Sequence, residues 1–139
     1  LELSKEQIIE MAESEEFILT VAENGFGKRT SSYHYRITNR GGSGIVNMVL
    51  SDKTGQVVAS MPADMNNELM LITNNGKLIR CKLDTVRVTG RSTSGVILFK
   101  TDKDENVVSA SLIAESSSEE NDGDDIDTDE PEIEPLESN

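Results

Sequence analysis

The chain has 139 residues, enough for one ordinary domain, and carries a formal net charge of −13. The charge is uneven, since residues 1–16 and 114–139 are acidic whereas residues 17–113 hold 12 Lys and Arg against 8 Asp and Glu. This division excludes a uniformly acidic protein and indicates either a nucleic-acid partner or a tail that masks a basic body. No stretch approaches the roughly 20 apolar residues that span a bilayer.

The single cysteine, Cys81, has no partner for an internal disulfide, which fits a reducing cytoplasm. We expect it to be a small buried apolar residue and not a reactive thiol. The chain begins at Leu1 without an initiator Met, so we expect it to be a piece of a longer protein.

Residues 4–15 begin with a capping-box pattern, in which Ser4 is followed three positions later by Gln7. Ile8 and Met11 share one face at helical spacing. The pattern predicts a short amphipathic helix, and we interpret residues 1–16 as a helical connector. A partner-binding helix is the alternative.

A shift of 51 positions aligns much of the chain with itself, from Asn24 to Ser111. The pair Asn24-Gly25 falls on Asn75-Gly76, and Arg29 falls on Arg80. Repeats near 50 residues are typical of propeller-like or arrayed units. The chain is therefore predicted to hold two copies of one all-β module.

Each copy is expected to form a four-stranded blade, about 17–63 for the first and 64–113 for the second, with turn signals between the strands. The predicted strands of the first copy are 17–22, 28–37, 45–50 and 56–61. Those of the second are 68–73, 77–82 or 77–88, 96–101 and 106–113. The third strands are almost continuously apolar, so we expect them to be buried on both faces.

Residues 114–139 hold no basic residue and 12 acidic ones. High like charge with few apolar groups does not compensate for the entropy of ordering, so a disordered acidic tail is predicted. It is either a solubilising segment or a polyanion that competes with DNA for the basic body.

No catalytic set, metal site or cofactor site is predicted. His34 is the only histidine and Cys81 the only cysteine, so a structural zinc site is excluded. The carboxylates of residues 122–129 do not fit the twelve-position calcium loop, and no phosphate-binding loop ending in Gly-Lys-Ser/Thr is present. An independent enzyme is therefore the least favoured interpretation.

Basic residues recur at the repeat spacing, as in the pairs Arg29/Arg80 and Arg40/Arg91. We expect one continuous cationic edge suited to duplex phosphates, the alternative being ordinary solvated strand residues. Scarce aromatics argue against base stacking on single strands. The predicted DNA-binding residues are Lys28, Arg29, Arg36, Arg40, Lys77, Arg80, Lys82, Arg87, Arg91 and Lys100.

Three motifs, Asn24-Gly25-Phe26-Gly27-Lys28-Arg29-Thr30, residues 90–96 and residues 104–108, resemble the last two blades of the C-terminal domain of bacterial DNA gyrase A. The resemblance implies a β-pinwheel, in which neighbouring blades exchange a strand. It also implies a basic rim that wraps double-stranded DNA while the enzyme, a heterotetramer of gyrase A with gyrase B, introduces negative supercoils with ATP. No small-molecule substrate or membrane partner is implied for this chain.

Two features of that family are missing from the chain. The seven-residue gyrase box is absent, and two loops resemble degenerate copies of it, formed by Arg40, Gly41, Gly42 and Gly44 and by Arg91 and Gly95. The domain with the active-site tyrosine is also absent, so we expect the chain neither to cut nor to wrap DNA alone. The related domain of topoisomerase IV and a propeller-type module that binds acidic proteins remain alternatives.

Overall fold

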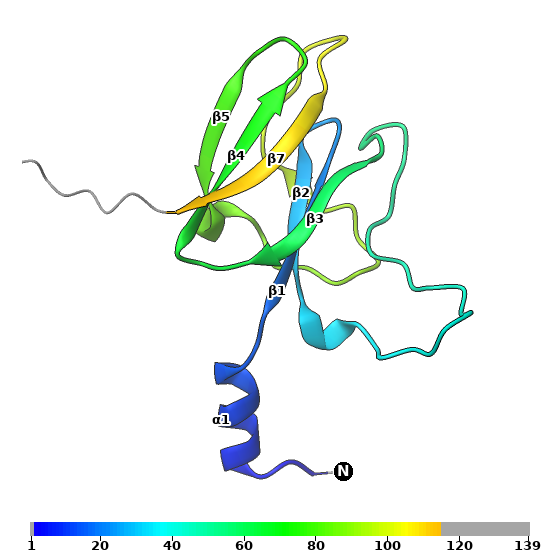
Figure 1. Ribbon diagram of the computed structural model, residues 1–139, viewed down its shortest axis with the longest axis vertical. Coiled ribbons are helices and arrows are strands. Elements are labelled where there is room, and N and C mark those ends of the chain that lie inside the picture. Colours follow the sequence, from blue (N-terminus) through cyan, green and yellow to red (C-terminus); the bar gives the residue numbers. More distant parts are fainter. Residues whose placement is uncertain (1, 115–139) are drawn as a thin grey trace, which may run out of the picture.

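Two antiparallel sheets and one short helix make up the computed structural model, which describes residues 2–114 (Figure 1). One sheet has the strand order β3-β1-β2-β6 and the other β5-β4-β7. The strands are β1 (Phe17–Ala22), β2 (Phe26–Ser31), β3 (Val57–Ala63), β4 (Asn67–Thr73), β5 (Leu78–Lys82), β6 (Val96–Ile97) and β7 (Val107–Ala114). The predicted all-β class with a short N-terminal helix is thus confirmed. The predicted tail lies outside the described residues, apart from Ala114 at the end of β7.

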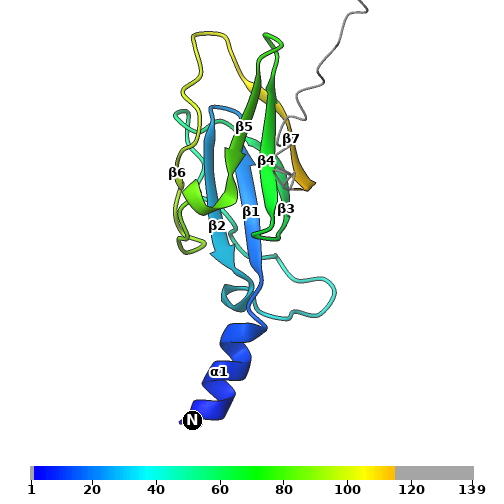
Figure 2. The ribbon, with the colours of Figure 1, turned by 90° about the vertical axis from the view of Figure 1, so that its left-hand side faces the viewer.

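Helix α1 (Lys5–Glu13) extends away from the sheets at one end of the molecule (Figure 2). Its capping box is formed as the sequence predicts: the Gln7 amide donates to Ser4 Oγ at 3.2 Å, and the Ser4 amide donates to Gln7 Oε1 at 2.9 Å. No residue of α1 is buried. Within residues 2–114, no helix is both long and apolar enough to cross a bilayer.

The repeat is visible in the backbone. A 3₁₀ turn, η1 (Ser32–His34), follows β2, and a second one, η2 (Leu83–Thr85), follows β5 at the same spacing as the sequence repeat. The prediction that the second strand runs on to residue 37 is wrong, because Ser31 Oγ accepts a hydrogen bond from the Tyr33 amide and starts the turn.

The core lies between the two sheets. Leu19 and Val21 of β1 and Leu69 and Leu71 of β4 are fully buried in one cluster, together with Leu83, Val86 and Val107. Alternate residues of a strand face the same side, so the inward faces of β1 and β4 pack against each other in this cluster.

The fourth strand of the first sheet comes from the second repeat. In β6, Val96 and Ile97 pair with Gly27 and Phe26 of β2. Further along β2, the Arg29 amide donates to the Arg87 carbonyl at 3.0 Å. Residues 86–99, here called the exchanged segment, therefore lie along β2. This is a strand exchange of the kind that the resemblance implies.

The counterpart of β6 in the first repeat is not a strand. Residues 45–50 form no strand, and Val46, Val49 and Leu50 are exposed whereas Met48 is buried. The prediction of a strand buried on both faces is wrong here. The physical reason is the lack of a partner strand. The exchanged segment pairs with the second strand of the repeat before it. Residues 45–50 would need such a strand before β1, where the described residues hold only α1.

Candidate nucleic-acid interface

Lys28 and Arg29, predicted to face DNA, lie inside the protein on the central strand β2. The side chain of Lys28 is fully buried and Arg29 is 8% exposed. Lys28 Nζ donates to the Gly90 and Arg91 carbonyls, both at 2.9 Å. Arg29 Nε donates to the Val86 carbonyl at 2.8 Å. Both cations thus hold the exchanged segment, and the prediction that they contact DNA does not fit this geometry.

Burial removes water from the charged groups of Lys28 and Arg29 and so disfavours their charged forms. Burial lowers the pKa of Lys28 to about 8, and the nearby charge of Arg91 adds to the shift. Burial also lowers the pKa of Arg29, while Asp84 opposes that shift. A cation–π contact, with the Arg29 guanidinium carbon 5.7 Å from the Phe17 ring centroid, provides further compensation.

Glycines let the exchanged segment lie directly on β2. A Cβ atom on Gly95 would lie 2.4 Å from the Gly27 carbonyl oxygen, and Gly95 has φ of +74°. A Cβ atom on Gly27 would lie 2.3 Å from Leu98 Cδ1. By contrast, Cβ atoms on Gly41 and Gly44 of the first box-like loop would have no described atom within 4 Å. The two loops therefore have different surroundings despite their similar sequences.

The second box-like loop, residues 89–95, is also fixed on its other side. Arg91 Nη1 donates to the Val46 carbonyl at 2.9 Å, and Ser94 Oγ donates to the Val49 carbonyl at 2.8 Å. The Val49 amide donates to the Thr93 carbonyl at 3.0 Å. The loop is thus held between β2 and residues 46–49 of the first repeat.

The remaining predicted DNA-binding residues lie at the surface. Arg80 and Lys82 lie on β5, where Arg80 Nε donates to the Glu68 carboxylate. Lys77 is paired with Asp102 at 2.9 Å, and this hydrogen bond is the main reason why the pKa of Lys77 is raised. The members of the predicted set that are exposed or half-buried outside these ion pairs are Arg36, Arg40, Lys82, Arg87, Arg91 and Lys100.

The two arginine pairs Arg29/Arg80 and Arg40/Arg91 do not occupy matching environments. Arg29 is buried under the exchanged segment, whereas its counterpart Arg80 is half-exposed and paired with Glu68. Arg40 lies in an open loop, whereas its counterpart Arg91 is half-buried and bonded to residue 46. The expectation of one edge built from equivalent charges therefore fails for these two pairs, whereas Arg36 and its counterpart Arg87 are both exposed.

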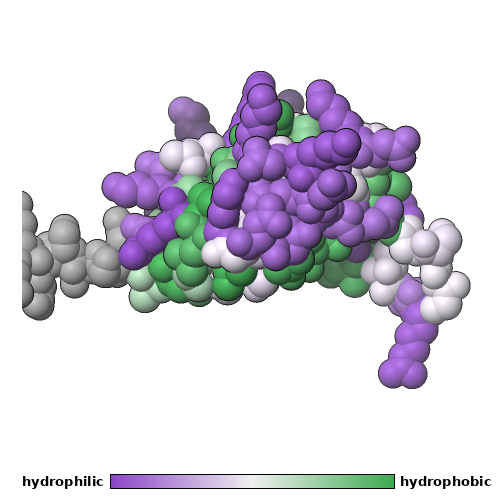
Figure 3. Space-filling model, turned by 90° about the horizontal axis from the view of Figure 1, so that it is seen from above, coloured by the Kyte–Doolittle hydropathy of each residue, from purple (hydrophilic) through white to green (hydrophobic). Residues whose placement is uncertain are grey.

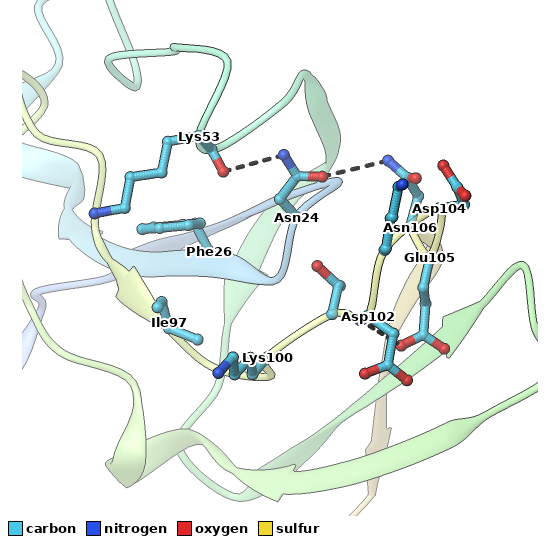
Figure 4. A pocket seen from close by; sticks show the side chains of 11 residues that line it. Asn24, Phe26, Lys53, Ile97, Lys100, Asp102, Asp104, Glu105 and Asn106 are labelled. Carbon is cyan, nitrogen blue, oxygen red and sulfur yellow. Dashed lines mark hydrogen bonds between the residues drawn. The ribbon is translucent and has the colours of Figure 1, made fainter.

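The end of the molecule that carries the interstrand turns is strongly hydrophilic (Figure 3). A pocket of about 490 Å³ opens there, with Lys53, Phe26 and Lys100 on one side and Asp102 and Asp104 on the other (Figure 4). Charges of both signs line this pocket. Carboxylates repel phosphate, so this end is a poorer DNA surface than the loops that carry Arg36, Arg87 and Arg91.

Glu105 organises one of these turns from within. Its carboxylate accepts hydrogen bonds from Thr73 Oγ1 at 3.1 Å and Asn75 Nδ2 at 3.2 Å. Desolvation alone would raise the pKa of Glu105, but the hydrogen bonds from the Asp102 amide and Thr73, with the charge of Lys77, outweigh it and lower the pKa. Glu105 therefore stabilises the turn that follows β4.

Within residues 2–114, no group of three or more His, Cys, Asp or Glu side chains is arranged to hold a metal ion. Cys81 is half-buried on β5, and its burial, with a contribution from Glu68, raises the pKa of the thiol. A raised pKa keeps the thiol protonated and poorly nucleophilic.

Two small antiparallel sheets from consecutive repeats, joined by an exchanged strand, define the class of propeller-type repeat proteins. A family model described as "DNA gyrase C-terminal domain, beta-propeller" matches residues 16–64 and 67–114. The chain belongs to this family.

Similar proteins include the DNA gyrase A of Rickettsia prowazekii, 71% identical over 118 residues, and that of Granulibacter bethesdensis, 49% identical over 127 residues. These alignments cover 85% and 91% of the chain. The chain spans 13% and 14% of the length of those relatives.

Two solved structures have similar folds. The chain matches a DNA gyrase A C-terminal domain with a TM-score of 0.65 at 28% identity, covering 70% of the chain and 33% of that structure. It also matches the C-terminal domain of DNA topoisomerase IV with a TM-score of 0.64, covering 71% of the chain and 31% of that structure. The identity to the topoisomerase IV domain is 17%, so that likeness shows the fold alone.

Proposed function

We propose that this chain binds duplex DNA through the phosphate backbone, as part of the C-terminal domain of a cytoplasmic DNA gyrase A. The observation that carries the proposal is the loop of residues 89–95 in a chain of this family, held firmly between two repeats with Arg87 and Arg91 beside or within it. A positioned cationic loop is suited to phosphates and reads no base sequence.

In the intact enzyme, this segment would help to wrap DNA while gyrase B hydrolyses ATP and the enzyme introduces negative supercoils. The chain would supply phosphate contacts and no catalytic group. The proposed contacting residues are the accessible cations Arg36, Arg40, Lys82, Arg87 and Arg91. Lys100 would contribute less, because it lines the pocket at the turn end, where carboxylates repel phosphate. Lys77 and Arg80 would contribute less, since carboxylates already bind them.

Salt dependence tests the proposal. If about four to six phosphates are engaged, log K for a short duplex of mixed sequence falls with log salt at a slope of roughly −4 to −5. Arg87→Ala should weaken binding and reduce the slope by about 1. Lys53→Ala, which removes an exposed charge from the turn end, is the matched control and should leave the slope unchanged. A flat salt dependence, or binding to acidic proteins that plasmid DNA does not displace, would contradict the proposal.

We also propose that residues 115–139 act as an intramolecular competitor of DNA. The support is charge alone, because residues 114–139 hold 12 acidic residues and no basic one, next to a basic body. Deleting 115–139 should tighten DNA binding, most strongly at low salt. Unchanged affinity would reduce this segment to a solubiliser.

A further inference from the structure

The buried ammonium of Lys28 has peptide carbonyls, and not a carboxylate, as its partners. Among residues 2–114, no carboxylate forms a salt bridge with Lys28, and its Nζ instead bonds the Gly90 and Arg91 carbonyls. Lysines are almost never fully buried unless paired, because the charge loses its hydration. Lys28 is therefore retained at a cost, in a position where it shapes the backbone of the loop of residues 89–95.

The direction of these carbonyls fixes the direction of two amides. In a trans peptide the C=O of one residue and the N–H of the next point in opposite directions, and no described peptide bond is cis. With the Gly90 and Arg91 carbonyls turned inward to Lys28, the N–H groups of Arg91 and Ser92 face away from it. Neither of these amides donates to an acceptor within residues 2–114, and Ser92 is exposed.

The charge around these amides is positive. Arg91 lies close enough to Lys28 for its charge to depress the lysine's pKa, and Arg91 remains partly exposed. Successive outward backbone amides beside a cation form the kind of concave site that binds phosphate groups. An anion at this point would also relieve the repulsion between Lys28 and Arg91.

We propose that Lys28 is a positioning residue that shapes residues 89–95 into a phosphate-binding loop. In this loop, one phosphate of the DNA backbone is bound by the Arg91 and Ser92 amides and by the Arg91 guanidinium. The inference rests on the proposed DNA-binding function, and it gives a buried lysine a role in binding without any contact to DNA.

The second repeat lacks this device. Ile79 stands where the first repeat has Lys28, and Leu78 stands where it has Gly27. Strand β5 therefore offers neither the ammonium nor the space that hold a loop on β2. Within residues 2–114, the arrangement occurs once, on the first repeat, although the loop that it positions belongs to the second.

Lys28→Met tests the inference, because methionine keeps an unbranched side chain and removes the donors. We expect duplex affinity at about 50 mM salt to fall roughly tenfold, although Lys28 is inaccessible. In the free protein, hydrogen exchange of the Thr89 and Val49 amides, which donate to the Arg29 and Thr93 carbonyls, should accelerate by roughly tenfold while that of β1 and β4 stays unchanged. Lys53→Met is the matched loss of one charge and should alter neither measurement.

The controls separate this inference from the proposed function. If Arg87→Ala and Arg91→Ala leave affinity unchanged, the DNA-binding proposal fails. If they weaken binding while Lys28→Met changes neither affinity nor the exchange of the Thr89 and Val49 amides, the positioning role fails. The double variant Lys28→Met/Arg91→Ala should bind less weakly than the sum of the single losses predicts, and strict additivity would overturn a shared site.

A second pair of variants tests the amides without disturbing Lys28, and keeps the inference testable if Lys28→Met does not fold. Ser92→Pro removes one outward N–H, whereas Ser92→Ala keeps it. We expect weaker duplex binding for the proline variant alone. Equal affinities for the two variants would show that this amide does not receive a phosphate.

Discussion

Replacing one glycine with alanine should show how much the exchanged segment stabilises the protein. Gly95 has φ of +74°, and an added Cβ would lie 2.4 Å from the Gly27 carbonyl oxygen. The left-handed conformation costs alanine about 1–2 kcal/mol. To relieve this overlap, the exchanged segment has to move away from β2. This movement weakens the pairing of β6 with β2 and the 2.8 Å hydrogen bond from the Leu98 amide to the Gly25 carbonyl. Two or three such bonds contribute about 1 kcal/mol each, so Gly95→Ala should lower the free energy of unfolding by about 3–5 kcal/mol.

The repeat supplies a matched control for this variant. Gly44 is the counterpart of Gly95, with φ of +76°, and a Cβ on it would meet no described atom within 4 Å. Gly44→Ala therefore carries the backbone cost without the overlap and should lower the unfolding free energy by no more than about 1–2 kcal/mol. Urea unfolding followed by circular dichroism measures both variants. Equal losses for the two would refute the claim that close packing of the exchanged segment stabilises the fold.

Three further predictions concern buried groups. The Lys28 ammonium loses its proton near pH 8 in the folded chain but near 10.5 in the unfolded one, so the unfolded chain binds more protons between these values and stability rises with pH there. In urea unfolding, the free energy of unfolding of the parent chain minus that of Lys28→Met should increase by up to about 3 kcal/mol from about pH 7.5 to 10.5. A difference that does not change with pH would contradict the burial of a charged lysine. The pKa of Glu105 is lowered, so the advantage of the parent chain over Glu105→Gln should be present above pH 4.5 and disappear as the pH falls below it, which acid titration of stability measures. Leu71→Ala, at a fully buried position, should cost about 2–5 kcal/mol of unfolding free energy, whereas Val108→Ala, at a position that is 55% exposed, should cost far less; similar losses would place the core elsewhere.

The sequence predicts features that depend on local chemistry or on the repeat itself. The capping box of Ser4 and Gln7 forms as expected, since it needs only residues three apart. The turns at residues 23–25 and 74–76 also lie where Asn-Gly predicts them, with Gly25 and Gly76 at positive φ. The division into two β units follows from the same spacing.

The sequence does not show which strand pairs with which. Lys28 and Arg29 of β2 are predicted to face DNA, yet all six residues of this strand are buried, and the exchanged segment covers its free edge. That cover comes from residues about 60 positions later in the chain, so no local pattern reveals it. The same distance explains why Lys28 and Arg29 resemble surface cations in the sequence. One signal was available: Gly27 beside Lys28 in the first repeat becomes Leu78 beside Ile79 in the second.

The strand exchange has a consequence for biosynthesis. When a ribosome has released only the first repeat, β2 presents an unsatisfied hydrogen-bonding edge and an ammonium with nothing to bind, because both partners have yet to be translated. The first unit therefore reaches its final form after the second has emerged. A nascent chain stalled at this stage would be prone to pair the free edge of β2 with a strand of another molecule.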